Sequence, residues 1–235
     1  MSTAVASPQR RVSLAAGWLY LLTFVSIPTF SLYGPVKGAN YVLGSGPDTA
    51  AIIGGILEIV VGLAGIATAV ALFPILKNQN ESFALGLLAA RVLESATIFV
   101  GVAFLLSIVT LRHNGAGPDA LGASHALVAL YDRIFLLGQS FMPAVCDLLL
   151  GYMLYKSRLV PRRLSLIGIV GGPLLVLGYL AVLFGAIGQH GGVAGLSALL
   201  VAVFEFSLGV WLIVRGFNPE AVAALKLTAS RQQQD

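Results

Sequence analysis

Six apolar segments, each of about 20 residues or more, follow one another along this chain of 235 residues. A helix of that length crosses the roughly 30 Å hydrocarbon core of a membrane, since it rises about 1.5 Å per residue. Charged residues make up only 10% of the chain, whereas a soluble domain has about 25%. We therefore predict an all-α, polytopic transmembrane helical bundle with six spans. The spans are expected near residues 14–32, 51–76, 83–111, 129–155, 164–187 and 195–214.

The segments between these runs are short and rich in Gly, Pro, Asn and charged residues, as loops are. Residues 1–217 should therefore form a single transmembrane domain, and residues 218–235 a short tail with a surface helix through Leu227. Arg10 and Arg11 precede the first run in the manner of a secretory signal. That run continues without a clean cleavage site after it, so we interpret it as an uncleaved first span.

The lysines and arginines predict the orientation, because positive charge gathers on the cytoplasmic side of membrane proteins. With a cytoplasmic N-terminus, only Lys37 and Arg112 lie in outside loops. The inside segments then carry Arg10, Arg11, Lys77, Lys156, Arg158, Arg162, Arg163, Arg215, Lys226 and Arg231. Both termini should therefore be cytoplasmic. The net charge of +4 is spread over loops rather than one face, which excludes nucleic acid as a partner.

Besides Asp132 and Arg133, close to the outer end of the fourth span, five ionisable side chains lie deeper inside the predicted spans, where they are costly and usually face a bundle interior. They are Glu58, Arg91, Glu94, Asp147 and Glu205. From the ends of their spans, the last four lie roughly 12–17 Å from the inner surface. Glu58 lies nearer the outside.

Local spacing suggests which way these side chains face. Glu58 lies four residues from Gly54 and from Gly62, and small residues of this kind line helix contacts in membranes. Glu58 is thus expected to face protein, and Arg133, at a similar depth, is a candidate partner for an outer ion pair. Arg91 and Glu94 share one helical face.

Two interpretations of the charged layer remain open. In one, Arg91 pairs with carboxylates and the charges only fix helix packing or serve partner binding. In the other, three carboxyls against one arginine leave excess negative charge, so at least one of Glu94, Asp147 and Glu205 holds a proton or a cation. That chemistry suits proton-coupled transport of a small molecule, or binding of a polar ligand. We favour the second interpretation, with a ligand or proton site built from Arg91, Glu94, Asp147 and Glu205 and with Glu58 nearer the outside.

Other kinds of site find little support. The histidines His113, His125 and His190 lack metal-ligand spacing, so no metal and no cofactor are expected. No nucleophile–base pair is evident, which argues against an enzyme, and Cys146 is interpreted as a packing residue. The loop cations Lys156, Arg158, Arg162 and Arg163 anchor the topology and can contact anionic lipid headgroups.

The order of segments resembles the DUF4386 family of bacterial integral membrane proteins. The similarity rests on AAGWLYLLTFV, ILEIVVGLAGIATAVALFPILK, ESFALGLLAARVLESATIF and DLLLGYMLYKSRLVPRRLSLIGIVGGPLLVLGYL. The last contains a G-Y-x-x-Y-x-S-x-x-[IV]-P-R connection between two spans. The resemblance covers most of residues 10–215. It implies six to seven spans in a bacterial cytoplasmic (inner) membrane, polar residues near Glu58, Arg91 and Glu94, and no established activity.

Overall fold

Helices make up 83% of the chain in the computed structural model, which describes residues 7–232. Six helical segments of that range are long and apolar enough to cross a membrane, so the chain is a multi-pass membrane protein, and the predicted fold class is confirmed. The elements are α1 (Pro8–Thr23), the 3-10 turn η1 (Phe24–Ser26), α2 (Thr29–Leu32), η2 (Tyr41–Leu43), α3 (Thr49–Leu76), α4 (Glu81–His113), η3 (Gly117–Asp119), α5 (Ala120–Phe135), the π-helix η4 (Leu136–Phe141), α6 (Met142–Ser157), α7 (Arg162–Leu183), α8 (Gly192–Val214) and α9 (Pro219–Gln232).

The first span differs from the single helix that we predicted. Helix α1 ends at Thr23, and the chain passes through η1 before the four-residue helix α2. Pro28, between the two, has no backbone N–H and so cannot continue the helical ladder. The sequence is apolar immediately before and after this break, so the apolar run gave no sign of it.

The fourth span begins earlier than predicted and is not uniformly α-helical. Its helical residues run from Gly117 to Ser157, about 60 Å at the usual rise, twice the hydrocarbon thickness. The π-helix η4 interrupts it just before Pro143. Pro143 therefore falls in the first turn of α6, where its missing N–H is tolerated.

The six spans form a closed ring. Helix α3 packs on α4, α4 on α5 and α6, α6 on α7, α7 on α8, and α8 returns to α1, which packs on α3. At the closure, the glycine pair Gly17 and Gly209 lets the backbones of α1 and α8 approach closely. A side chain that faces the middle of this ring meets side chains from several spans.

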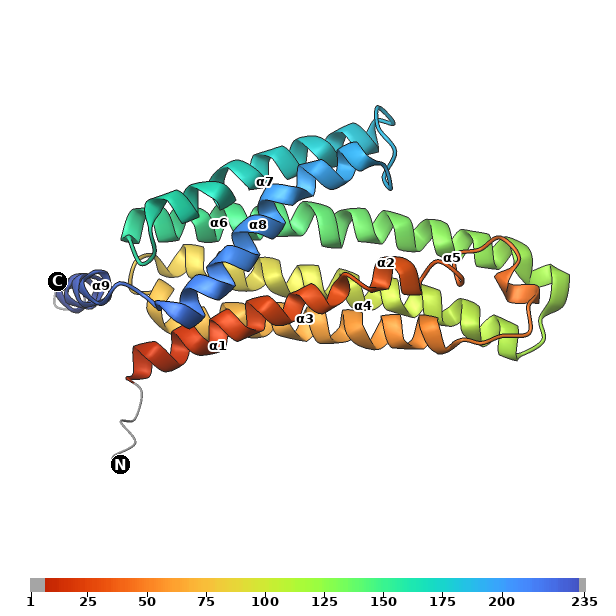
Figure 1. Ribbon diagram of the computed structural model, residues 1–235, viewed down its shortest axis with the longest axis horizontal. Helices are drawn as coiled ribbons and strands as arrows, with labels where there is room; N and C mark the ends of the chain where they lie inside the picture. The colour runs from red at the N-terminus through yellow and green to blue at the C-terminus, as the bar shows by residue number, and fades with distance from the viewer. Residues whose placement is uncertain (1–6, 233–235) are drawn as a thin grey trace.

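The start of α1 and the whole of α9 lie at the same end of the bundle (Figure 1), here called the α9 end. Arg10 joins α1 to α8 at this end. Its Nη1 and Nη2 donate to the carbonyls of Leu212 and Ile213, in the last turn of α8, at 3.0 and 2.5 Å. Helix α9 is docked by the Asn218 N–H, which donates to the Leu159 carbonyl at 2.9 Å. This helix continues to Gln232, beyond our prediction of Leu227; residues 233–235 lie outside the described range.

The opposite end, called the far end, carries a polar cluster around the buried side chain of Asp48, in the loop before α3. Its carboxylate binds Tyr41, Arg112 and His113. Although burial raises the pKa of Asp48, hydrogen bonds from these three side chains outweigh it and hold the pKa below its usual range. The cluster ties the loop of residues 33–48 to the end of α4.

This cluster predicts a loss of stability in acid. A carboxyl whose pKa is lower in the folded state stabilises the fold above its unfolded pKa of about 3.9, and that contribution disappears as the pH falls through the folded value. We expect the free energy of unfolding to drop below about pH 4, and the drop to be smaller in Asp48→Asn. Unfolding in detergent between about pH 3 and pH 7 measures this; equal acid sensitivity of the two proteins would contradict it.

Candidate functional site

The structure brings together four of the five ionisable residues that were predicted to lie inside spans. Arg91 on α4 donates through Nη1 to both carboxylate oxygens of Glu94, at 3.2 and 3.0 Å. Its Nη2 donates to Oε1 of Glu205 on α8 at 2.5 Å and lies 4.0 Å from Oδ1 of Asp147 on α6. One guanidinium therefore has three carboxyls from three helices around it. We call these four residues the central cluster.

Helix α4 is held so that this face points inward. The hydroxyl of Ser95, one turn after Arg91, lies 2.7 Å from the carbonyl oxygen of Gly62 on α3 and 2.8 Å from that of Arg91. This contact fixes α4 against α3. Arg91, Glu94 and Ser95 are all buried, as the shared helical face suggested.

Two further residues complete the surroundings of the cluster. The guanidinium carbon of Arg91 lies 5.7 Å from the ring centroid of Tyr20, which α1 contributes. The thiol of Cys146 donates to Oε2 of Glu94 at 3.5 Å, so Cys146 contacts the cluster as well as packing. We missed both, and an isolated Tyr or Cys in an apolar run carries no spacing signal that would have found them.

Asp147 has a different environment from the two glutamates. It is fully buried, and neither of its carboxyl oxygens has a hydrogen-bond partner among residues 7–232. Its one ion-pair contact within that range is the 4.0 Å approach to Arg91. A buried carboxylate without hydrogen bonds is strongly disfavoured relative to the neutral acid.

A cavity of about 250 Å³ borders the cluster. Arg91, Glu94 and Glu205 line it, whereas Asp147 does not. The remaining walls are mixed, with Thr23, Ser26, Thr29, Ser95 and Gln139 among apolar side chains such as Phe24, Phe30, Ile98 and Val201. The cavity lies between the broken first span, α4 and α8, so three of the four charged groups face open space rather than dry packing.

Glu58 lies in a separate polar layer and is not paired with Arg133. Its carboxylate accepts hydrogen bonds from Tyr33 at 3.2 Å, from Tyr131 at 3.1 Å and from the Gln139 amide at 3.1 Å. Arg133 is exposed, and no ion pair joins it to Glu58 in the part of the chain that the structure describes. Similar depth in the membrane did not predict a contact, because Glu58 on α3 is buried in the bundle whereas Arg133 on α5 is on its surface.

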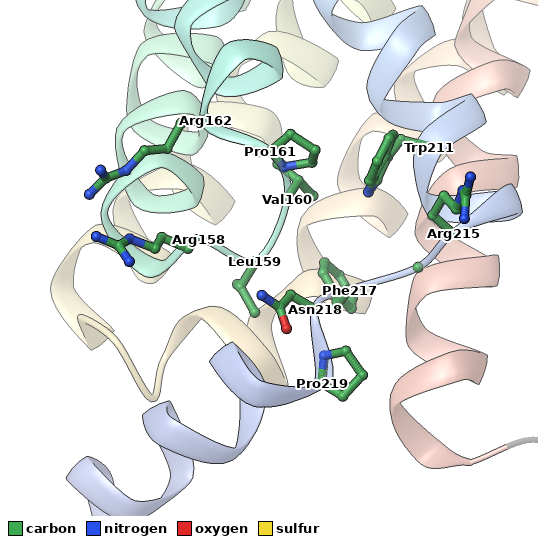
Figure 2. A pocket seen from close by; sticks show the side chains of 11 residues that line it. Arg158, Leu159, Val160, Pro161, Arg162, Trp211, Arg215, Phe217, Asn218 and Pro219 are labelled. Atoms are coloured by element: carbon green, nitrogen blue, oxygen red, sulfur yellow. The ribbon is translucent and has the colours of Figure 1, made fainter.

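Two of the loop cations, Arg158 and Arg162, border a second, open groove of about 680 Å³ at the α9 end. It lies between the α6–α7 loop and the α8–α9 connection (Figure 2). Trp211, Pro161 and Phe217 form its middle, while the guanidinium groups of Arg158 and Arg215 point to opposite sides. These two guanidinium groups do not point toward a common site, whereas the charged groups of the central cluster contact one another.

The sequence itself places the chain among known proteins. The model of the family described as "Domain of unknown function (DUF4386)" matches residues 15–216. The chain belongs to this family. The matched range of this DUF4386 protein includes the first span from residue 15 onward, the other five spans completely and every residue of the central cluster. Comparisons with curated proteins and with solved structures gave no match.

Proposed function

We propose that this DUF4386 protein binds a proton and a small molecule at the central cluster, as a proton-coupled transporter or a ligand-binding membrane protein. We place it in a bacterial cytoplasmic membrane with both termini inside, on the distribution of lysine and arginine. The observation that carries the proposal is the cavity at the cluster, lined by Arg91, Glu94 and Glu205. Charges that only fixed packing would need no space beside them.

The charge balance supports a proton at the site. Three carboxyls surround one guanidinium in a region of low dielectric, so full ionisation would leave two excess negative charges. Asp147 is the residue that we assign as the neutral acid, because its oxygens receive no hydrogen bond. Glu94 and Glu205 both accept from Arg91 and are the ionised partners.

A structural role is the alternative function, and one observation favours it. Both Nη atoms of Arg91 are engaged by carboxylates, and Asp147 is packed without space around it. Such a cluster could fix the packing of α4, α6 and α8 without binding anything. An enzyme is a weaker candidate, since the Ser95 hydroxyl is committed to backbone carbonyls rather than to a base.

An infrared pH titration of the protein in lipid tests the proposal. We expect a protonated carboxyl signal at neutral pH that disappears in Asp147→Asn and changes as the pH is raised. Glu220→Gln, in α9, is the control and should leave the signal intact. If all the cluster carboxyls ionise below about pH 5, near their model-peptide values, the proton site does not exist.

Anionic lipid headgroups are the proposed partners of Lys156, Arg158, Arg162 and Arg163. All four are exposed and lie on or beside the α6–α7 loop. Cations at this position attract anionic lipid at the membrane surface. The contact would orient the bundle in the bilayer and is separate from the central cavity.

A further inference from the structure

The central cavity is poorly suited to an anion. Arg91 is its one cationic wall residue, and both of its Nη atoms already donate to Glu94 and Glu205. An anionic ligand would have to displace a buried carboxylate and leave it unpaired, which is costly. Only Nε of Arg91 is without a partner, and it lies on a side chain that is 4% exposed.

The same contacts leave room for one positive charge. With Asp147 neutral, the ionised pair Glu94 and Glu205 exceeds Arg91 by one negative charge. A monovalent cation in the cavity would balance that charge, and so would one further proton on a glutamate. A cation and a proton would therefore compete for the same site.

The end of α1 adds to this preference. Helix α1 has 16 residues and stops at Thr23, and Thr23 and Phe24 both line the cavity. The C-terminal end of a helix carries partial negative charge from its last carbonyls, and this favours a cation nearby. The interruption of the first span thus places a second source of negative potential at the cavity wall.

Apolar side chains of the broken first span lie between the cavity and the lipid-facing surface. Ile27 and Phe30, on the broken span, line the cavity and are 60% and 70% exposed. Exposed apolar side chains on a membrane span face lipid. A ligand that reached the cluster past these residues would need an apolar body next to its charge.

We propose that the cavity binds a small monovalent organic cation with an apolar body, in competition with a proton. The inference rests on the proposed function and names the ligand class of the same site. The volume of about 250 Å³ limits the ligand to a small molecule. Binding of the cation at low pH displaces one proton from Glu94 or Glu205 to water, so charge balances in each state.

Three probes of similar shape test the ligand class: benzyltrimethylammonium as the cation, neopentylbenzene as the neutral isostere and benzenesulfonate as the anion. Binding is measured to the full chain in lipid nanodiscs, with empty nanodiscs as the blank. We expect the cation to bind at least about tenfold more tightly than either other probe. Its apparent affinity should fall by up to about tenfold per pH unit once a cavity glutamate takes up a proton, with proton release on binding.

Two variants locate the binding. Glu205→Gln removes the excess charge and should abolish the preference for the cation, while Ala202→Leu fills the cavity without changing charge and should weaken every probe. Glu220→Gln serves as the control and should bind like the wild type. A thermal unfolding profile like that of the wild type shows that each variant is folded.

The outcomes separate this inference from the proposed function. If the infrared titration finds the protonated carboxyl but the neutral or anionic probe binds as tightly as the cation, the ligand class is wrong and the proton site stands. Cation binding that does not respond to pH or to Glu205→Gln also overturns the inference. If there is neither a protonated carboxyl nor binding, both proposals fail and the structural role is left.

Discussion

Arg91→Met is expected to destabilise the folded protein by about 3–5 kcal/mol, the usual cost of removing one partner from a buried charge cluster. The substitution keeps most of the side-chain length but leaves Glu94, Asp147 and Glu205 with no positive charge among them. The carboxyls would then repel one another or take up protons and lose their hydrogen bonds. Unfolding by a denaturing detergent in mixed micelles measures the change.

Compensating substitutions distinguish the charge from the side-chain volume. Adding Glu94→Leu and Glu205→Leu to Arg91→Met should recover a large part of the lost stability, because no unpaired carboxylate then faces the cavity. Arg133→Met is the matched control on an exposed arginine and should change stability by no more than about 0.5 kcal/mol. Equal effects of Arg91→Met and Arg133→Met would show that the central ion pairs contribute little.

Gly17→Ala is expected to destabilise the bundle by about 1–3 kcal/mol through overpacking at the contact that closes the ring. A Cβ atom at this position would lie 2.7 Å from Cγ1 of Ile213 and 2.8 Å from the carbonyl oxygen of Gly209. The isoleucine side chain could move, but a helical carbonyl oxygen cannot. Helices α1 and α8 would have to separate beside the cavity.

Gly122→Ala provides the matched control, since a Cβ atom at Gly122 in α5 would meet nothing within 4 Å. Alanine is the better helix former, so this variant should be unchanged or more stable by about 0.5–1 kcal/mol. Both variants are compared by unfolding in the same detergent mixture. Opposite signs are expected; a neutral Gly17→Ala would mean that the α1–α8 contact is looser than the distances indicate.

Much of the architecture could be predicted from the sequence because hydropathy reports directly on the membrane. All six long apolar helical segments end within four residues of the predicted spans, and all but the first and the fourth also begin within three residues of them. The rise per residue of a helix, counted from the span ends, predicted that Arg91, Asp147 and Glu205 lie at a similar depth in the membrane. That estimate needs only the span ends, which apolar runs mark well.

The direction in which a side chain faces was harder to predict. Glu58 and Arg133 were expected to pair from similar depth, yet Glu58 binds Tyr33, Tyr131 and Gln139. The rotation of a helix about its axis depends on which helices pack against it. An apolar run has apolar side chains on every face, so its sequence does not show which face meets protein and which meets lipid. For the same reason, the contact of Tyr20 with Arg91 could not be predicted, because it depends on the packing of α1 that closes the ring.

The interruption of the first span has a mechanical consequence. A continuous helix resists bending because each turn is bonded to the next, whereas Phe24–Leu32 is held by short 3-10 bonds and one turn of α-helix. Stiffness is therefore lowest in the segment that separates the charged cavity from lipid. Among the other walls, α4 and α8 are uninterrupted α-helices, whereas the fourth span contributes Gln139 from the π-helix η4. A motion that opens the cavity toward lipid, past Ile27 and Phe30, would therefore bend the segment Phe24–Leu32 before it disturbs α4 or α8.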